Sequence, residues 1–265
     1  MSEAAPTILA ADSGLGGLTI VAEIRKALPQ ARLAYLCDNA FFPYGTRPDA
    51  ELLGHFLGVM NQAIRRVQPD LIVTACNTIS TICLPQLRAA TSIPVVGVVP
   101  AIKPAAQQSR RKIIGLLATP ATIDRPYTDD LIQRYAADCT VLKIGSADLV
   151  EMAEAKLLGP AVNQDRLRSI LAPFFDRPAD AQPDLVVLAC THFPLLREEL
   201  QAAGPVGVAW IDSGAAVARR VVEVLPPARS NGGVSNLALT SADADAALRH
   251  ALSQFGFPAV DTLAG

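Results

Sequence analysis

The sequence predicts an α/β protein made of two pseudo-symmetric, doubly wound parallel-sheet domains. Three observations lead to this fold class. Strand-like and helix-like segments alternate along the chain, and the alternation restarts near residue 100. In addition, residues 68–78 read QPDLIVTACNT and residues 182–192 read QPDLVVLACTH, identical at seven of eleven positions. Each repeat places a cysteine just past an apolar run that is typical of a buried parallel strand.

The individual elements follow from apolar runs and turn residues. Strands are expected at 8–11, 33–37, 71–75, 94–98, 113–117, 140–144, 185–188, 208–211 and 237–239. Helices are expected at 18–28, 50–67, 80–89, after Thr122 or Asp124, and at 148–158, 164–175, 195–203, 213–225 and 242–254, the last capped by Ser241. Strands that alternate with helices of this length imply parallel sheets with right-handed crossovers.

The restart of the pattern sets the domain boundaries. We expect residues 1–98 and 207–265 to form the first α/β domain, which would carry Asp12 and Cys76. The second domain would span residues 99–206 and carry Cys190 and His192. The repeated segment is then a trace of pseudo-twofold symmetry, and we expect the active site in the cleft between the two domains.

Composition excludes several classes of function. The 265 residues are 51% hydrophobic and 18% charged, which provides a large core and no segment typical of disorder. A net charge of −2 gives no basic surface for nucleic acid. The longest apolar stretch, 93–102, is too short for a membrane span, and the N-terminus lacks a signal-peptide pattern. We therefore expect a cytoplasmic protein with no nucleic-acid or membrane partner.

The two repeated cysteines are the strongest candidates for chemistry. Ligands of open α/β sheets bind beyond the carboxyl ends of the strands, where Cys76 and Cys190 are expected. Two thiols on opposite walls of a cleft suit a reaction in which one removes a proton and the other returns one. Asp12 and His192 are placed to relay protons to them. The alternative is that both cysteines are ordinary core residues, as we expect for Cys37, Cys83 and Cys139.

Polar residues near the same strand ends are candidates for binding. The loop 12–17, DSGLGG, lacks the dinucleotide fingerprint because Thr19 stands where Gly or Ala is needed, so it either grips a small anion or serves only helix packing. Asn77, Thr78 and Thr191 either hold an α-amino and an α-carboxylate or cap helices. Tyr44 is either at the rim of the cleft or a plain surface residue.

Neither a metal nor a cofactor is expected. A zinc site built from Cys76, Cys190 and His192 is weakly supported because the chain has no CxxC or HxxxH pair. The remaining histidines, His55 and His250, have no recognisable partners in the sequence and are interpreted as surface residues.

A set of motifs resembles the glutamate racemase family over about residues 7–220. The motifs are ADSGLGGLT (11–19), DNAFFPYGTR (38–47), TACNTIS (74–80), VVGVVPAIKPA (95–105), GLLATPAT (115–122), LACTHFPLL (188–196) and IDSGAA (211–216). The resemblance implies a cofactor-independent isomerase that interconverts L-glutamate and D-glutamate. Such an enzyme supplies D-glutamate for peptidoglycan synthesis, and hence for cell wall biogenesis and cell shape.

The resemblance also assigns roles to individual residues. Cys76 and Cys190 match the catalytic acid/base groups, with Asp12 assisting the first and His192 and Glu154 assisting the second. The matched substrate-binding positions are Asp12, Ser13, Tyr44, Gly45, Asn77, Thr78, Thr119, Thr122, Thr191 and His192. The stretch 95–105 and the helix around Glu154 resemble the subgroup activated by UDP-N-acetylmuramoyl-L-alanine. Assembly into a homodimer is left open.

Three other functions remain alternatives. One is racemisation of aspartate or another acidic amino acid. Another is a non-catalytic protein that binds an acidic ligand, in which the thiols are dispensable. The last is thiol-based hydrolysis by Cys190 and His192, which leaves Cys76 without a role.

Overall fold

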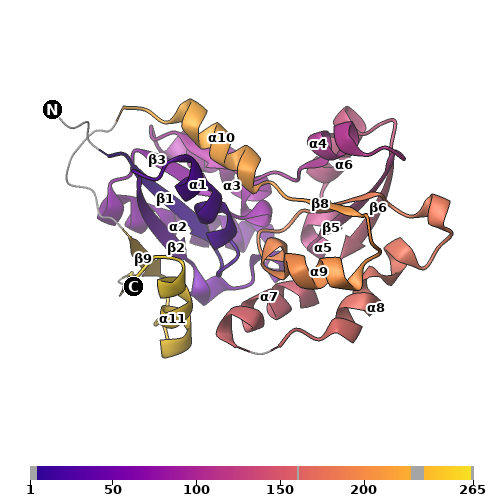
Figure 1. Ribbon diagram of the computed structural model, residues 1–265. Helices are drawn as coiled ribbons and strands as arrows, with labels where there is room; N and C mark the ends of the chain where they lie inside the picture. The colour runs from indigo at the N-terminus through magenta and orange to yellow at the C-terminus, as the bar shows by residue number, and fades with distance from the viewer. Residues whose placement is uncertain (1–4, 160, 228–235, 264–265) are drawn as a thin grey trace. The chain divides into compact units, whose positions relative to one another are not determined.

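Parallel strands and helices alternate through the whole chain (Figure 1). The computed structural model describes residues 5–159, 161–227 and 236–263. The strands are β1 (Thr7–Asp12), β2 (Arg32–Cys37), β3 (Leu71–Thr74), β4 (Val95–Gly97), β5 (Ile113–Ala118), β6 (Thr140–Gly145), β7 (Leu185–Leu188), β8 (Ala209–Ile211), β9 (Leu237–Thr240) and β10 (Ala259–Thr262). Every recorded strand pair is parallel, as the sequence predicted.

The helices follow the expected order. The α-helices are α1 (Leu18–Ala27), α2 (Asp49–Val67), α3 (Asn77–Ala90), α4 (Ile102–Gln108), α5 (Pro120–Ile123), α6 (Pro126–Tyr135), α7 (Asp148–Leu158), α8 (Gln164–Phe175), α9 (Arg197–Ala203), α10 (Gly214–Val224) and α11 (Ala246–Gln254). Short 3-10 helices are η1 (Asn39–Phe41), η2 (Tyr44–Thr46), η3 (Ala179–Ala181) and η4 (Phe193–Leu196). The sequence did not predict α4, β10 or the 3-10 turns.

The cap of α11 corrects one detail of the sequence analysis. Ser241 does not cap this helix, because its Oγ accepts a hydrogen bond from the backbone N–H of Ala40 at 3.0 Å. Asp245 is the cap instead, and its carboxylate accepts the N–H of Leu248 at 2.8 Å. Both residue types suit the position, so composition alone did not distinguish them.

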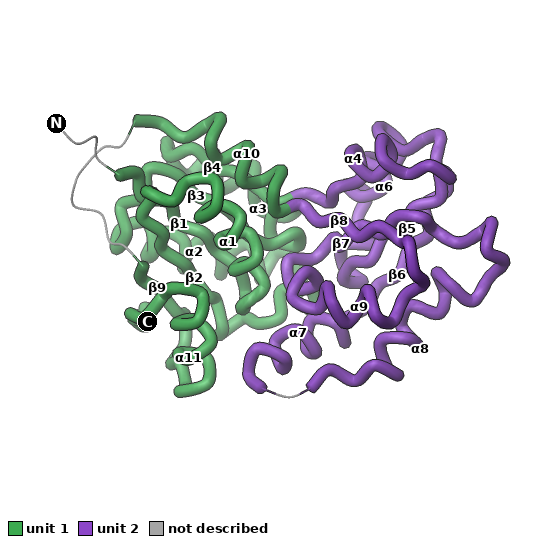
Figure 2. The backbone as a smooth tube through the Cα atoms, viewed as in Figure 1, with its two compact units in different colours: residues 1–98, 214–265 green, residues 99–213 purple. Residues whose placement is uncertain are grey.

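The chain divides into two compact units (Figure 2). Unit 1 contains residues 1–98 and 214–265, and unit 2 contains residues 99–213. The sequence analysis placed the return to unit 1 at residue 207. The difference arises because β8 pairs with β7, register Val186 with Trp210, and so belongs to the sheet of unit 2.

The two sheets share a strand order that creates equivalent binding positions. In unit 1 the order is β10-β9-β2-β1-β3-β4, and in unit 2 it is β6-β5-β7-β8. Each sheet therefore contains four strands in the order second, first, third, fourth. The switch point of such a sheet lies between its first and third strands, and ligands bind beyond the carboxyl ends there. Asp12 ends β1 and Cys76 follows β3, while Thr119 follows β5 and Cys190 follows β7.

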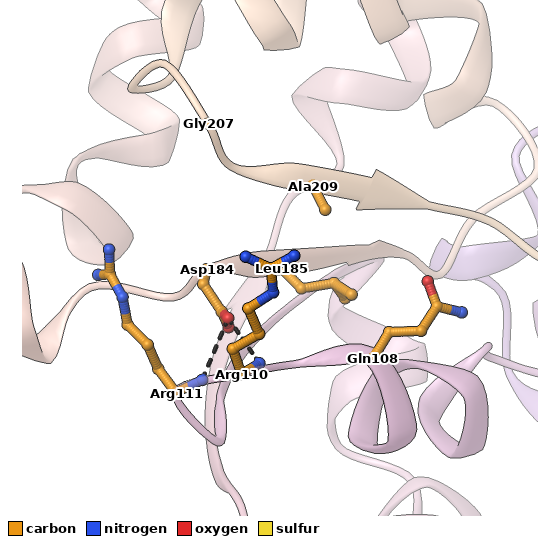
Figure 3. A pocket seen from close by; sticks show the side chains of 7 residues that line it. All are labelled: Gln108, Arg110, Arg111, Asp184, Leu185, Gly207 and Ala209. Atoms are coloured by element: carbon orange, nitrogen blue, oxygen red, sulfur yellow. Dashed lines mark hydrogen bonds between the residues drawn. The ribbon is translucent and has the colours of Figure 1, made fainter.

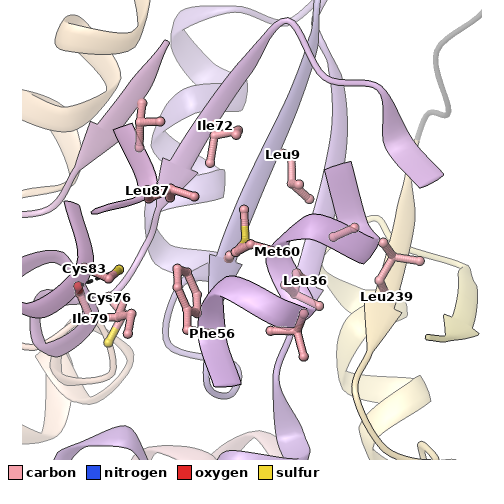
Figure 4. Packing of buried hydrophobic residues seen from close by; sticks show 14 of the residues in the cluster. Leu9, Leu36, Phe56, Met60, Ile72, Cys76, Ile79, Cys83, Leu87 and Leu239 are labelled. Carbon is pink, nitrogen blue, oxygen red and sulfur yellow. Dashed lines mark hydrogen bonds between the residues drawn. The ribbon is translucent and has the colours of Figure 1, made fainter. Parts of the chain in front are cut away.

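Helices cover both faces of each sheet. In unit 1, α1 packs against α10 and α2 packs against α3. The second pair covers a core cluster that includes Leu9, Phe56 and Ile72 (Figure 4). Cys76 and Cys83 lie near each other at one end of this cluster. In unit 2, α4 and α6 cover one apolar cluster.

The head of each repeated segment has a structural role. Asp70 accepts a hydrogen bond from the N–H of Thr7 at 2.9 Å, and so supports the start of β1. Asp184 accepts hydrogen bonds from Ser109 Oγ at 2.6 Å and from the N–H groups of Arg110 and Arg111 at 2.8 and 3.1 Å. The aspartate of each QPD sequence thus fixes the segment that leads into the neighbouring strand.

Asp184 gives a testable prediction about stability and pH. Burial alone would raise its pKa, but the hydrogen bonds from Ser109, Arg110 and Arg111 hold the pKa below its ordinary value. A carboxyl whose pKa is depressed by folding stabilises the protein above its unfolded pKa, and this stability is lost as pH falls through the folded pKa. We expect Asp184→Ala to lower the free energy of unfolding at pH 7 by roughly 1 kcal/mol after allowance for solvent screening. Urea unfolding at pH 7 and below pH 4 checks this. A loss of equal size at both values would contradict the electrostatic account.

No helix within the described residues is long and apolar enough to cross a membrane. This finding agrees with the absence of a long apolar stretch in the sequence.

Candidate functional site

In unit 1, a buried carboxylate and a buried thiol follow neighbouring strands. Asp12 is fully buried at the end of β1, and Cys76 is 7% exposed just beyond β3. The N–H of Ala75 donates to the carbonyl of Ala11 at 2.7 Å, so the pairing of the two strands continues up to these residues. The N–H of Ser13 donates to the Asp12 carboxylate at 2.7 Å and fixes its orientation. Cys76 occupies the N-cap position of α3, where unpaired N–H groups favour a thiolate.

Asn77 is the first residue of α3, and its side-chain oxygen is a buried hydrogen-bond acceptor. It is 4% exposed, and its Oδ1 accepts no hydrogen bond from any described residue. A buried acceptor without a donor costs free energy, so such atoms are uncommon in native structures unless a ligand completes them. The atom lies one residue after Cys76 and needs a donor such as an ammonium group.

Gly17 allows the close packing of this region. A Cβ at this position would lie 2.8 Å from Cβ of Asp12, 2.9 Å from the Tyr35 hydroxyl and 3.0 Å from Cβ of Ala75. Real Cβ atoms essentially never make contacts this short, and Asp12 and Ala75 lie at the switch point between β1 and β3. Gly17 of loop 12–17 therefore serves close packing, which was one of the two interpretations of the loop.

Gly17→Ala is expected to lower kcat/KM by roughly 10- to 100-fold, because a displacement of Asp12 by a fraction of an ångström misaligns the site. Gly58→Ala is the matched control, since a Cβ there meets nothing within 4 Å. Activity of the two variants at equal folded concentration checks the prediction. Equal activity would show that the packing of Gly17 is irrelevant to the chemistry.

Tyr44 is buried beside the same thiol. It is 2% exposed, belongs to the cluster that contains Cys76, and donates its hydroxyl to Asp38 Oδ2 at 2.6 Å. Burial first, then the charge and hydrogen bond of Asp38, raise the pKa of Tyr44 well above its ordinary value, and the charges of Cys76 and Asp12 raise it further. Tyr44 therefore stays neutral and is not a plain surface aromatic. Gly45 lies next to it in η2.

In unit 2, a carboxylate, an imidazole and a thiol lie in succession, each close to the next. Glu154 Oε1 lies 2.7 Å from His192 Nε2, and His192 Nδ1 lies 3.9 Å from the sulfur of Cys190. Cys190 and His192 are 7% and 3% exposed. A neutral His192 that donates Nε2–H to the carboxylate presents an unprotonated Nδ1 to the thiol. The arrangement can accept a proton from Cys190 and return it.

Hydroxyl groups complete this region of unit 2. Thr119 follows β5, and its Oγ1 lies 3.0 Å from Oγ1 of Thr122. Thr191 separates Cys190 from His192 and is 3% exposed. These hydroxyls are buried. One proton of the Thr119–Thr122 pair is used between the two hydroxyls, which leaves one for an anionic group.

The site residues predicted from the sequence fall into two sets. In unit 1, Asp12, Ser13, Tyr44, Gly45, Cys76, Asn77 and Thr78 all belong to the ends of β1 and β3 or to η2 and the start of α3. In unit 2, Thr119, Thr122, Glu154, Cys190, Thr191 and His192 belong to the ends of β5 and β7, to α5 or to α7.

The sequence analysis missed three polar residues near these sets. Asp38 is fully buried at the end of β2, and His55 from α2 lies 2.8 Å from its Oδ2. The interpretation of His55 as a surface residue without a partner is therefore wrong. Ser80 accepts the N–H of Val98 at 3.0 Å and lies 2.8 Å from Thr74 Oγ1. The position of Asp38 directly after a strand, as for Asp12, was the available signal.

The other cysteines differ from the repeated pair. Burial raises the pKa of Cys83 to about 12, and its thiol donates to the carbonyl of Ile79 at 3.0 Å. Cys37 is buried at the end of β2, whereas Cys139 is only partly buried against the apolar cluster of unit 2. The core prediction is therefore confirmed for Cys37 and Cys83 and holds only in part for Cys139.

A pocket of about 460 Å³ lies away from these residues (Figure 3). It surrounds Asp184 and Leu185 at the amino end of β7, the opposite end of the strand from Cys190. Its lining includes Arg110 and Arg111, whose N–H groups hold the Asp184 carboxylate. Within the described parts of the chain, no group of three or more His, Cys, Asp or Glu side chains is arranged to hold a metal ion.

Comparison with known proteins gives consistent matches over nearly the whole chain. Glutamate racemase from Pectobacterium carotovorum is 47% identical over 264 residues, which cover 97% of this chain and 91% of that protein. Glutamate racemase from Sodalis glossinidius is 46% identical over 259 residues, with 95% and 89% covered. Escherichia coli glutamate racemase, solved with L-glutamate and the activator UDP-MurNAc-Ala, is 44% identical, covers 98% of each chain, and superposes with a TM-score of 0.93.

The family model gives the same result. The model described as Asp/Glu/Hydantoin racemase matches residues 18–221, which include β3 with Cys76 and β7 with Cys190. The match spans most of both units. This chain belongs to the Asp/Glu/hydantoin racemase family.

Proposed function

We propose that this chain interconverts L-glutamate and D-glutamate by moving the α-proton between two thiols, with no cofactor. One observation carries the proposal. Two buried cysteines, Cys76 and Cys190, follow equivalent strands of two sheets with the same strand order, and each has a proton-carrying group nearby. Inversion requires one base and one acid on opposite faces of a single α-carbon, and we propose that the two duplicated cysteines serve as this pair.

The chemical difficulty is the weak acidity of an amino-acid Cα–H. Its removal beside a carboxylate gives a dianionic, enolate-like species, which must be stabilised as its charge develops. Preorganised N–H and hydroxyl donors in a water-poor site are the means available to a protein. The N–H groups at the start of α3 and the hydroxyls of Thr119, Thr122 and Thr191 are such donors.

The two thiols have different partners. His192 Nδ1 takes the proton of Cys190, and Glu154 stabilises the imidazolium that results, so Cys190 becomes a thiolate. Asp12 ends the strand next to the one that precedes Cys76, and it serves as the carboxylate of that half-reaction. In either direction one cysteine begins as thiolate and the other as thiol, and the two exchange states during each turnover.

The substrate's ammonium group has a partner in unit 1. The buried Oδ1 of Asn77 has no donor among the described residues, and an ammonium supplies one. The hydroxyls of Ser13, Thr78 and Thr191 and the Thr119–Thr122 pair then hold the two carboxylates. Tyr44 and Gly45 form a wall beside Cys76.

The choice of glutamate rests on the relatives. Proteins at 44–47% identity over nearly the full chain are glutamate racemases, and the one from E. coli was solved with L-glutamate. The physiological role that follows is the supply of D-glutamate for peptidoglycan, in the cytoplasm, where the free cysteines stay reduced. We also propose UDP-N-acetylmuramoyl-L-alanine as an activator, since the E. coli relative binds it.

Polarimetry on purified protein tests the proposal. L-glutamate with no added cofactor is expected to lose its optical rotation and end as an equal mixture of isomers. L-aspartate under the same conditions is expected to react at least tenfold more slowly, because a side chain one methylene shorter misplaces its carboxylate. A parallel trace with the UDP activator is expected to be faster.

The same experiment separates the alternatives. Faster turnover of aspartate than of glutamate would identify aspartate as the preferred substrate. Tight binding of glutamate with an unchanged optical rotation would indicate a binding protein. Equal rates with and without the UDP compound would remove the activator from the proposal without affecting the racemase assignment. Hydrolysis by Cys190 and His192 would leave a trapped acyl-cysteine, which mass spectrometry detects.

A further inference from the structure

A buried cluster in unit 1 lies behind Tyr44, and its other members have no role in the reaction as described above. We define the Asp38 cluster as Asp38, Tyr44, His55 and Phe41. Asp38 is fully buried at the end of β2, and its backbone N–H donates to the carbonyl of Asp12 at 2.8 Å. A carboxylate without solvent must be satisfied by donors, since an unpaired buried charge is strongly unfavourable.

Two side chains from different elements satisfy this carboxylate. Tyr44 Oη donates to Oδ2 at 2.6 Å. His55 Nε2 lies 2.9 Å from Oδ1 and 2.8 Å from Oδ2, within reach of both oxygens. Because Tyr44 has a raised pKa and stays protonated, its hydroxyl is a permanent donor to Asp38.

The imidazole of His55 is itself held in place. It stacks on the ring of Phe41, with centroids 3.4 Å apart and planes 5° from parallel. Arg47 covers the ring of Phe41 at 4.7 Å, and the side chain of His55 is 20% exposed. The next residue of α2, Phe56, meets the ring of Tyr44 edge-on at 6.0 Å. Helix α2 therefore contacts both the Asp38 carboxylate, through His55, and the ring of Tyr44, through Phe56.

The consequence concerns the wall beside Cys76. Tyr44 packs in the same cluster as Cys76, and the charges of Cys76 and Asp12 act on its hydroxyl. Its hydroxyl donates to Asp38, so the position of the phenol oxygen is set by a carboxylate that His55 also contacts. A loss of the His55 contact frees the carboxylate, and with it the orientation of Tyr44.

We propose that His55 is a positioning residue for substrate binding, acting through Asp38 on Tyr44. The inference rests on the proposed function, because it assigns Tyr44 to the wall that a bound glutamate contacts. A wall contacts the ground state and the transition state alike, so its displacement raises KM and leaves kcat nearly unchanged.

Steady-state kinetics of His55→Leu tests the proposal. The variant keeps an apolar side chain on Phe41 but has no donor for Asp38. KM for both glutamate isomers is expected to rise roughly tenfold while kcat stays within about threefold, the pattern for lost uniform binding. His55→Gln retains an N–H donor and is expected to restore most of the affinity. His250→Leu, at an exposed histidine of α11, is the control and is expected to match the wild type.

A second variant tests the route through Asp38. Tyr44→Phe keeps the ring and removes the hydroxyl, and it is expected to raise KM as well. If both changes act through one carboxylate, the double variant is expected to raise KM by less than the product of the two single effects. If His55→Leu does not fold, Tyr44→Phe alone still tests the route, because a wild-type KM in that variant would overturn it.

The outcomes separate the positioning role from a purely structural one and from failure of the proposed function. A lower melting temperature of His55→Leu with wild-type KM would overturn the inference. So would a His55→Gln variant no better than His55→Leu, or fully multiplicative effects in the double variant. A wild-type protein that does not racemise glutamate would instead contradict the proposed function.

Discussion

Cys76→Ala and Cys190→Ala are each expected to lower the rate of glutamate racemisation by roughly 10²- to 10⁴-fold, the usual contribution of one positioned acid/base group. In the proposed scheme, one thiol is the base that removes the proton from one face and the other is the acid that delivers a proton to the opposite face. If one of the two thiols is removed, one face of the α-carbon has no acid/base group, and inversion is slow. Racemisation rates of the two variants against the wild type, measured by polarimetry, check the size of the effect.

The two variants are expected to differ in the hydrogen-exchange activity that they retain. In heavy water, the surviving thiol can still remove the α-proton from the glutamate isomer whose α-proton faces it. The same thiol then returns a deuteron to the same face. Cys76→Ala should thus exchange one isomer without inversion, and Cys190→Ala should exchange the other. Cys83→Ala is the matched control, because its buried thiol has a pKa of about 12 and should not take part. Exchange of the same isomer by both variants would contradict the assignment of opposite faces.

His192→Ala is expected to lower kcat/KM by roughly 10²-fold, because Cys190 then has no acceptor for its proton. Glu154→Ala should have a smaller effect, roughly tenfold, since the imidazole remains but loses the partner that sets its tautomer. The two isomers of glutamate have equal free energy, so kcat/KM must fall by the same factor in both directions. Initial rates from each isomer measure these factors.

The pH profile distinguishes a proton relay from a structural effect. If His192 relays the proton, the wild-type profile should contain a limb that His192→Ala lacks. Glu151→Ala is the control, because Glu151 is exposed on α7, the helix that carries Glu154. This variant should keep the wild-type pH profile. An unchanged pH profile in His192→Ala would remove His192 from the relay and leave it a packing role.

The features predicted correctly from the sequence depend on local pattern. Apolar runs of a few residues identified most of the strands, and the duplicated segment located both cysteines at equivalent strand ends. Periodicity does not report pairing, however. The short β8 was assigned to the wrong sheet because only its hydrogen bonds to β7 decide where it belongs. β10 is a short edge strand with partly exposed residues, so its apolar signal is weak.

The site was predictable to the same extent. The positions of Asp12, Cys76 and Cys190 at the carboxyl ends of strands were predicted, because position along the chain indicates which end of the sheet a residue occupies. The Asp38–His55 contact was not found, since it joins residues 17 positions apart through a fold-dependent approach of α2 to β2. The Glu154–His192 contact, 38 positions apart, was anticipated only through the family resemblance.

The most direct test of the account is the fate of the α-hydrogen when purified protein racemises L-glutamate in heavy water. The two-thiol scheme predicts that each molecule of D-glutamate formed early in the reaction carries deuterium at Cα, while unreacted L-glutamate still carries hydrogen. The reaction from D-glutamate should give the mirror result. Product that retains its original hydrogen, detected by proton NMR or mass spectrometry, would contradict proton transfer through two separate thiols.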